Sequence, residues 1–223
     1  MPPDLWVAQL GRLPYGEAVG LQELLRSARQ AGDIPDSLLL LEHDPVYTKG
    51  RRSERADLPM GEDWYRSQGI DVVRTDRGGK LTYHGPGQLV GYPIMHVTDV
   101  IEYVRTVERG VIAALADEGL DAEVREGLTG VWAGDAKIGS IGVHVSRGVT
   151  THGLAVNVDN DLQPFEWIVP CGIEGVAMTS VDKEVGGEQA VEPFADLLVA
   201  RYASSFKRKP RDDIAVPGLA VRD

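Results

Sequence analysis

The feature that most constrains the fold is a pair of long β-rich runs that follow one another almost directly. AKIGSIGVHVS spans residues 136–146, and VTTHGLAVNV spans residues 149–158. Only Arg147 and Gly148 separate them. Two β-rich runs joined by such a short glycine-containing turn are typical of an antiparallel hairpin. Because two shorter runs, AEVRE and GVWAG, precede this pair, we expect several short strands in this half of the chain.

Helical periodicity is confined to three segments outside this hairpin. Apolar residues recur at helical spacing over residues 14–32. A second and longer helix is expected from Asp99, which with Glu102 fits a capping box, to about Gly119. Pro193 begins a third helix. Further strands are expected over residues 6–10, 37–41, 70–74 and 88–97.

This mixture of elements predicts an α+β fold, with a mixed, mostly antiparallel sheet and flanking helices in a single domain. We expect the domain to span residues 1–206 and residues 207–223 to form a loose, polar tail. The chain is 43% hydrophobic and 26% charged, which is typical of a soluble globular protein. No signal peptide or membrane-spanning run is recognisable, so we expect a cytoplasmic protein without a membrane partner.

The chain is acidic overall and basic in one place. A net charge of -11 argues against nucleic-acid binding, because neutralising phosphates requires a basic surface. A local basic cluster suits an anionic substrate or an acidic carrier protein, although charge alone equally allows a solvated loop. The cluster consists of Lys49, Arg51, Arg52 and Arg55, followed by Arg74, Arg77 and Lys80.

Several familiar motifs do not fit. Gly79 and Lys80 are followed by Leu81 rather than serine or threonine, so the phosphate-binding P-loop pattern fails. The glycines of residues 85–91 have the wrong spacing for a dinucleotide fingerprint, and residues 139–142 lack the first glycine of a nucleophile elbow. The five histidines are scattered without a metal-binding pattern, so no metal is expected.

The segments that remain combine glycine with polar or reactive side chains. They are residues 77–88, 137–142 and 152–157, where glycine would let a ligand approach the backbone closely. Cys171, the only cysteine, lies in IVPCGI between a proline and a glycine. A lone cysteine is either a nucleophile or a small apolar filler, and its immediate neighbours do not decide between the two.

Four segments together resemble the signature segments of the lipoyl (octanoyl) transferases. They are RGGKLTYHGPGQLVGYPI from Arg77, AKIGSIGVHV from Ala136, THGLAVNV from Thr151 and PCGI from Pro170. LLLLEHDPVYTKGRR, from Leu38, resembles a fifth and more peripheral segment. The resemblance covers approximately residues 5–206. It implies the fold of the biotin and lipoate protein ligases, in agreement with the α+β prediction.

The family transfers an octanoyl group from acyl carrier protein to a lysine of a lipoyl domain through a cysteine thioester, without a cofactor. By this resemblance Cys171 is the acyl-accepting nucleophile and Lys137 is the lysine that works with it. Gly139, Val156 and Asp159 depart from common family residues, and the first two could alter the acyl pocket. The residues matched to substrate binding are Arg77, Gly78, Gly79, Lys80, Leu81, Thr82, Tyr83, His84, Ser140, Ile141, Gly142, Gly153, Leu154 and Ala155.

Cys171 and Lys137 suit this chemistry, because a thiolate is the attacking species and a neighbouring ammonium lowers the pKa of the thiol.

The expected partners are octanoyl-acyl carrier protein and the lipoyl domains of 2-oxoacid dehydrogenases and the glycine cleavage H protein. A monomer is the default expectation. Two alternatives stay open from the sequence: an ATP-dependent lipoate or biotin ligase of the same fold, and a carrier-binding domain in which Cys171 only packs.

Overall fold

The structure is a computed structural model that describes residues 1–169, 176–187 and 189–212. The strands are β1 (Asp4–Leu13), β2 (Asp36–His43), β3 (Val46–Lys49), β4 (Asp71–Arg74), β5 (Leu81–His84), β6 (Gln88–Ile94), β7 (Glu123–Arg125), β8 (Leu128–Ala133), β9 (Ala136–Ser146), β10 (Val149–Asn157) and β11 (Lys209–Arg211). The helices are α1 (Tyr15–Ala31), α2 (Glu62–Ser67), α3 (Val100–Asp117), α4 (Gln163–Glu166), α5 (Val181–Val185) and α6 (Val191–Ser205), with a short 3-10 turn, η1 (Arg55–Asp57).

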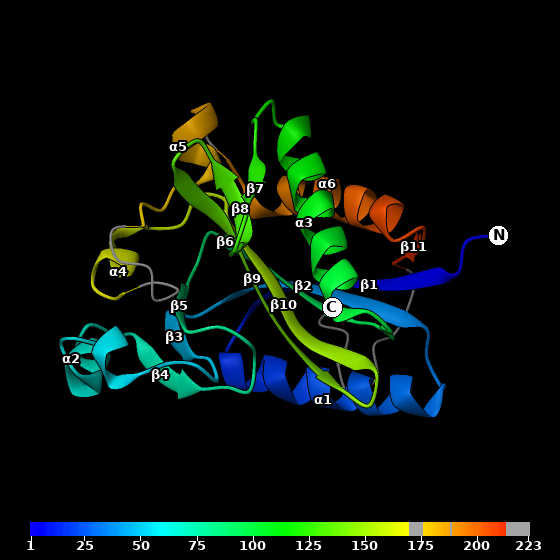
Figure 1. Ribbon diagram of the computed structural model, residues 1–223, viewed down its shortest axis with the longest axis horizontal. Coiled ribbons are helices and arrows are strands. Elements are labelled where there is room, and N and C mark those ends of the chain that lie inside the picture. The colour runs from blue at the N-terminus through cyan, green and yellow to red at the C-terminus, as the bar shows by residue number, and fades with distance from the viewer. Residues whose placement is uncertain (170–175, 188, 213–223) are drawn as a thin grey trace.

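The main sheet of the described chain has the strand order β11-β1-β2-β6-β10-β9-β8-β7 (Figure 1). β1 runs parallel to its neighbours β2 and β11. The other neighbouring pairs are antiparallel, so the predicted mixed and mostly antiparallel sheet is confirmed. The expected hairpin is also present, because β9 and β10 pair from Val149 opposite Ser146 to Val156 opposite Gly139.

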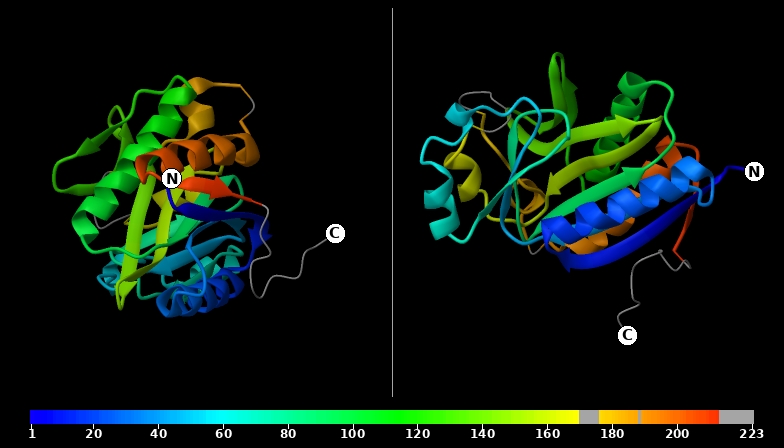
Figure 2. Two further views of the ribbon diagram at one scale, coloured as in Figure 1. Left: turned by 90° about the vertical axis from the view of Figure 1, so that its right-hand side faces the viewer. Right: turned by 90° about the horizontal axis from the view of Figure 1, so that it is seen from below.

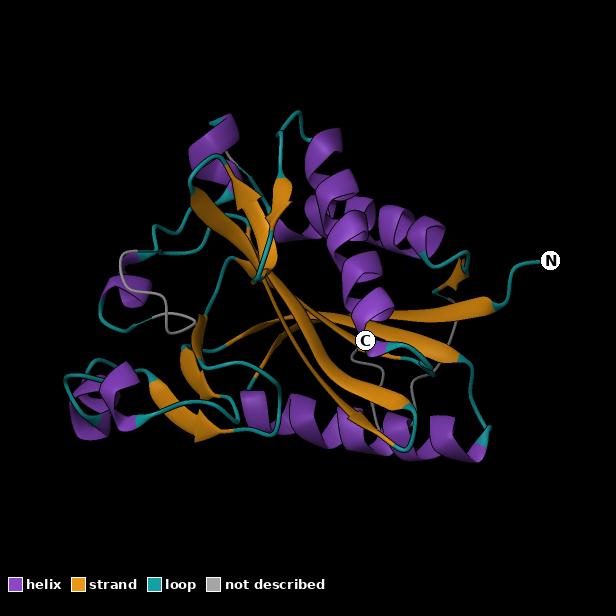
Figure 3. Cartoon of the chain, viewed as in Figure 1, coloured by secondary structure: helices purple, strands orange, loops and turns teal. Residues whose placement is uncertain are grey.

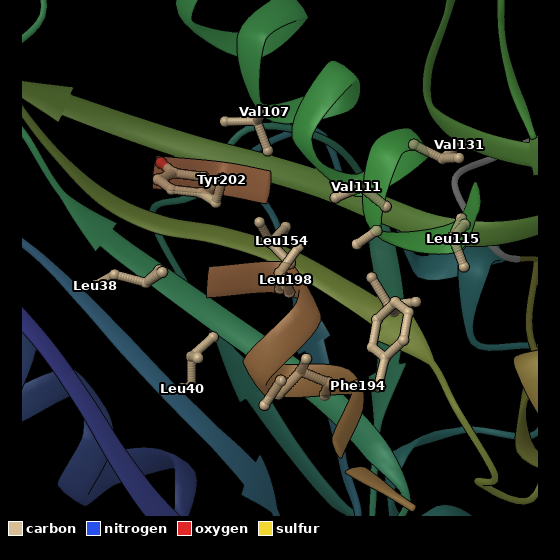
Figure 4. Close-up of a cluster of buried hydrophobic side chains, with 14 of the residues drawn as sticks. Leu38, Leu40, Val107, Val111, Leu115, Val131, Leu154, Phe194, Leu198 and Tyr202 are labelled. Carbon is tan, nitrogen blue, oxygen red and sulfur yellow. The ribbon is translucent and has the colours of Figure 1, made fainter. Parts of the chain in front are cut away.

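Helices cover both faces of this sheet (Figures 1 and 2). Leu38 and Leu40 of β2 belong to the core beneath α3 and α6, whereas Leu39 and Leu41 belong to the core beneath α1. Side chains alternate between the two faces of a strand, so a strand that is buried on both faces is continuously apolar. Figure 4 shows Leu38 and Leu40 on the face of the sheet that is covered by α6, together with Leu198 of that helix.

A second, smaller sheet has the order β4-β3-β5 and lies beside α2 at the left of Figure 3. Its core is aromatic and includes Tyr47, Tyr65, Tyr83 and Phe165. The sequence predicted β4 but neither β3 nor β5. Both are four residues long and lie in polar or glycine-rich surroundings, where hydrophobic periodicity is too short to detect.

Two helix starts differ in detail from the prediction. Asp99 caps α3 as expected, by accepting hydrogen bonds from the N–H groups of Ile101 and Glu102. The Glu102 carboxylate turns to Thr106 and Arg109 instead of returning to Asp99, so the predicted capping box is only half formed. α6 begins at Val191, two residues before Pro193, because the first turn of a helix does not need the N–H group that proline lacks.

The prediction of a loose tail over residues 207–223 is wrong for the first residues of that range. Lys209 to Arg211 form β11, which pairs with Asp4 to Trp6 at the edge of the main sheet. Arg208 is anchored as well, since its guanidinium donates to Asp36 at 2.8 Å. A three-residue strand is too short to show a periodic pattern in the sequence. Residues 209–211 form a strand because β1 lies beside them and pairs with them.

The helices of the described chain are all too short or too polar to cross a membrane.

Candidate active site

A cavity of about 420 Å³ is lined by both sheets and by the loop that precedes β5. It brings together almost all of the residues that the sequence predicts for catalysis and substrate binding. Tyr83 is the exception, because its ring packs in the aromatic core against Tyr47 and Phe165. Cys171 lies outside the described residues. The predicted residues in the lining are Arg77, Gly78, Gly79, Lys80, Leu81, Thr82, His84, Lys137, Ser140, Ile141, Gly142, Gly153, Leu154 and Ala155.

The cavity also has a lining that the sequence analysis did not single out. Tyr15 comes from α1 and Val104 from α3, while Gly127 precedes β8 and Leu128 and Thr129 begin it. These residues lie far apart in the sequence and have no shared motif. Only the packing of the helices against the sheet brings them to one place.

Arg77 fixes the shape of the loop over residues 77–80. Its side chain is buried, and its guanidinium donates to the hydroxyl and carbonyl oxygens of Thr48 and to the carbonyl of Gly78 at 3.0 Å. The N–H group of Gly78 donates to the carbonyl of Val143 at 2.9 Å, which ties the loop to β9. A Cβ at Gly142 would lie 3.0 Å from the Gly78 oxygen, so glycine permits this close approach.

His84 begins a buried chain of hydrogen bonds behind the cavity. Its Nδ1 donates to the Gln88 side-chain oxygen at 2.6 Å, and the Gln88 amide donates to Asn157 at 2.9 Å. Asn157 in turn donates to the backbone carbonyl of Thr179. Burial lowers the pKa of His84 well below its usual range, so its ring is neutral. His84 therefore lines the cavity and organises neighbours, in keeping with the site-lining role that the sequence suggested.

His152 occupies an unusual position in β10. Its φ of 56° lies in the left-handed region, and its N–H group donates to the side chain of Gln22 at 2.6 Å. Nε2 lies 2.7 Å from Asp76 Oδ1, and His144 approaches the other carboxylate oxygen at 3.4 Å. Burial lowers the pKa of His152, although the hydrogen bond to Asp76 opposes this. The contact between His152 and Asp76 fixes the His152 ring at the cavity wall.

Aromatic and histidine rings pack together beside these groups. His43 Nε2 lies 2.7 Å from the hydroxyl of Tyr92, and its Nδ1 donates to the carbonyl of Leu13. Its ring contacts that of Tyr15, which stacks on His84. Burial lowers the pKa of His43 to about 4. The ring of His43 is therefore neutral at physiological pH and acts as a fixed dipole.

Lys137 is buried, with only 3% of its surface exposed, which is rare for lysine. Its Nζ donates to the carbonyl of Thr129 at 2.9 Å and lies 5.7 Å from the centre of the Trp132 ring. Its backbone pairs with the chain that follows residue 175, since its N–H donates to Ala177 and its carbonyl accepts from Thr179. The hydrogen bond to Thr129 therefore holds the Lys137 ammonium at the cavity, and the backbone of Lys137 lies beside residues 177–179.

The basic segment, residues 49–55, borders the glycine-rich loop, and its Arg52 also lines the cavity. The N–H groups of Gly50 and Arg52 donate to the carbonyls of Lys80 and Gly79, so the segment and the loop form one unit. Arg51, Arg52, Arg55 and Arg74 are exposed, whereas Lys49 is paired with Glu62 at 2.6 Å. A surface groove of about 1110 Å³ contains Lys49, Arg55 and Arg74 beside the apolar side chains of Leu58, Met60 and Trp64.

Asp57, just after the basic segment, contacts the chain that precedes Cys171. The carbonyl of Asp57 accepts a hydrogen bond from the N–H of Val169 at 3.2 Å, and its carboxylate lies 3.6 Å from Lys80. The basic segment, the glycine-rich loop and residue 169 are therefore joined through Asp57.

Among the described residues, no group of three or more histidine, cysteine, aspartate or glutamate side chains is placed to hold a metal ion.

Known proteins are similar to this chain in sequence. The chain is 42% identical to an octanoyltransferase of Koribacter versatilis, over 91% of this chain and 84% of the relative. It is 48% identical to an octanoyltransferase of Mycolicibacterium smegmatis, over 90% of this chain and 88% of the relative.

Solved structures share the fold at low sequence identity. A bipartite lipoate protein ligase from Thermoplasma acidophilum superposes with a TM-score of 0.75 at 19% identity, over 96% of this chain and 87% of that one. A biotin protein ligase from Aquifex aeolicus gives 0.52 at 12% identity, over 91% and 69%. The predicted biotin and lipoate ligase fold is confirmed. The model of the Lipoyl protein ligase A/B catalytic domain matches residues 14–203, and the chain belongs to that family.

Proposed function

We propose that the protein transfers an octanoyl group from octanoyl-acyl carrier protein to a specific lysine of lipoyl domains, through a thioester on Cys171. The observation that carries this proposal is that three separate signature segments line one cavity, with the buried Lys137 among them. The octanoyltransferase relatives support the same chemistry, because their identity to this chain extends over most of both sequences. The enzyme is an acyltransferase.

The cavity suits a medium-length acyl chain. Its volume lies within the range of small-ligand sites, and Leu81, Ile141 and Leu154 supply apolar walls. One methylene in an apolar pocket changes binding by about 1 to 3 kcal/mol, so these walls allow only modest selection among chain lengths. Gly139 and Val156 are buried in β9 and β10, where a Cβ added at Gly139 would lie 3.2 Å from the Val131 side chain. Enlarging Gly139 would therefore press on Val131.

In the first half-reaction the Cys171 thiolate attacks the carbonyl carbon of the donor thioester. The new bond joins the Cys171 sulfur to the acyl carbon, and the bond between the acyl carbon and the carrier sulfur breaks. The carrier leaves as a thiolate and takes up a proton. The ammonium of Lys137 would favour the attacking thiolate and neutralise the developing charge. A backbone N–H near Cys171, with Gly172 as the candidate, would donate to the tetrahedral oxyanion.

In the second half-reaction the lysine amine of a lipoyl domain attacks the Cys171 thioester. A C–N bond forms, the C–S bond breaks, and the amine loses a proton, for which Lys137 is the proposed acceptor. An amide is more stable than a thioester, so this step runs downhill without ATP. The two half-reactions therefore use Lys137 in opposite protonation states.

The carrier proteins would dock at the basic segment. Acyl carrier proteins are acidic, and the exposed arginines Arg51, Arg52, Arg55 and Arg74 are complementary to them. Through Asp57 the same segment contacts Val169, two residues before Cys171. Lipoyl domains of 2-oxoacid dehydrogenases and the glycine cleavage H protein would be the acceptors. A cytoplasmic location and a monomeric state are part of this proposal.

Intact-mass spectrometry tests the proposal directly. Incubation with octanoyl-acyl carrier protein in the absence of ATP should add one octanoyl group, and Cys171→Ser should prevent stable loading as a thioester. Subsequent addition of a lipoyl domain should move the group to its lysine. Loading that requires ATP would favour the ligase alternative, and no adduct on Cys171 would favour a carrier-binding domain.

A further inference from the structure

We propose that Glu108 is a positioning residue that holds the Lys137 ammonium in place through a single peptide group. The inference rests on the proposed function, in which Lys137 takes part in both half-reactions. Glu108 lies on α3, outside every signature segment, and its side chain is only 1% exposed. A buried carboxylate is costly unless its oxygens are paired, so its two contacts are informative.

The two oxygens of Glu108 have different partners. Oε2 accepts a hydrogen bond from the guanidinium of Arg105, one turn earlier on α3, at 2.7 Å. Oε1 accepts a hydrogen bond from the backbone N–H of Gly130 at 3.1 Å. The carboxylate is therefore anchored to its own helix on one side and directed at β8 on the other.

The Gly130 N–H belongs to the same peptide group as the Thr129 carbonyl, which accepts the hydrogen bond from Lys137 Nζ at 2.9 Å. The peptide is trans, so its C=O and N–H point in opposite directions. Lys137 and Glu108 thus bond to opposite edges of one plane. A cation at the oxygen and an anion at the N–H polarise the peptide in the same sense, and each hydrogen bond strengthens the other.

Gly130 is constrained to allow this arrangement. Its φ of 131° is a conformation that residues with a side chain rarely adopt. A Cβ at this position would lie 2.6 Å from Cε of Lys137 and 2.6 Å from the carbonyl oxygen of Gly139. The peptide, the lysine stem and β9 are in close contact, so a rotation of the peptide would displace the ammonium.

A double-mutant cycle on acyl loading separates this role from general stabilisation. Loading of Cys171 from a small soluble octanoyl thioester is followed by intact mass at single turnover. The variants are Glu108→Met, Lys137→Met and the double variant. Glu108→Gln keeps an oxygen acceptor, and Glu102→Gln alters an exposed carboxylate on the same helix as the matched control.

We expect Glu108→Met to slow loading about 10- to 100-fold, since misplacement of a catalytic group by about 1 Å has effects of this size. Glu108→Gln should recover most of the rate, and Glu102→Gln should match the wild type. Combined with Lys137→Met, Glu108→Met should add less than about twofold, because Glu108 acts through that lysine. Thermal unfolding of each variant shows that it is folded; if Glu108→Met is not, Glu108→Asp, which shortens the reach to Gly130, takes its place in the cycle.

Equal slowing by the Glu108 change in both backgrounds would overturn the inference in favour of a general structural role. A wild-type loading rate for the Glu108 variant would overturn it as well. Wild-type loading by Lys137→Met alone would instead contradict the role of Lys137 in the proposed function, and the inference would fail with it.

Discussion

The region around Lys137 and the basic segment differ in how firmly the surrounding structure fixes their positively charged side chains. Lys137 is buried and donates to a backbone carbonyl in a part of the sheet where glycine permits close contacts. The arginines at positions 51, 52 and 55 are exposed on a segment whose backbone, rather than its side chains, is fixed to the glycine-rich loop. A cation that acts on a reacting atom needs a fixed position, whereas cations that attract a carrier act over several ångströms through solvent.

This difference predicts large and salt-insensitive effects at the buried region and small, salt-sensitive effects at the exposed one. The largest is expected for Lys137→Ala, which should slow both acyl loading and transfer to the amine by about 10²- to 10⁴-fold, the usual range for a lost acid or base. Rapid-quench measurement of each half-reaction checks this. Lys183→Ala, at an exposed position on α5, is the control, and near-normal rates for both half-reactions would contradict the dual role.

The buried histidines should make stability depend on pH. Since burial lowers the pKa of His43 to about 4, the unfolded chain binds a proton near pH 6.5 that the folded chain does not. Stability is therefore complete above about pH 6.5 and is lost as the pH falls toward 4, by about 3 kcal/mol for this group.

His43→Gln should flatten this pH dependence, because glutamine can donate to Leu13 and accept from Tyr92 without titrating. Urea unfolding between pH 4 and 7.5 measures the slope, with the exposed His96→Gln as the matched control. An unchanged slope in His43→Gln would show that other groups cause the acid sensitivity.

Gly130→Ala should lower activity by about tenfold or more, because the added Cβ would meet the Lys137 stem and the Gly139 carbonyl. Gly134→Ala is a matched control. Gly134 also has a positive φ, of 51°, and nothing lies within 4 Å of an added Cβ, so it reports an added methyl group at positive φ without a contact. Steady-state kinetics together with melting temperatures separates the two, and equal losses of activity would exclude a specific contact with Lys137.

The smallest effect is expected at the basic segment. Charge reversal at Arg51 and Arg55, which are exposed and do not line the cavity, should slow loading from acyl carrier protein several-fold, mainly through association, and added salt should mask the loss. Loading from a small soluble thioester should be unchanged. Equal slowing with both donors would mean that these arginines act on the cavity rather than on the carrier.

Much of the fold was predictable because its elements carry strong local signals. The β9–β10 hairpin followed from two β-rich runs and a short turn, and the buried β2 followed from its continuous leucines. β3, β5 and β11 were missed, since each is too short to show a period and is held by partners distant in the sequence. The cavity lining was largely predicted through the signature segments, although Tyr83 was assigned to it and instead packs in the aromatic core.

The sequence by itself determined the fold class, the family resemblance and the pairing of Cys171 with Lys137 as the proposed reactive residues. These depend on residue types and spacing, which are local properties of the chain. Only the tertiary structure decided that Lys137 is buried, and that Glu108 reaches it through the Thr129–Gly130 peptide. α3 and β8 show no shared pattern in the sequence. Their contact arises from packing of the helix on the sheet, and this packing determines which backbone groups a buried carboxylate can meet.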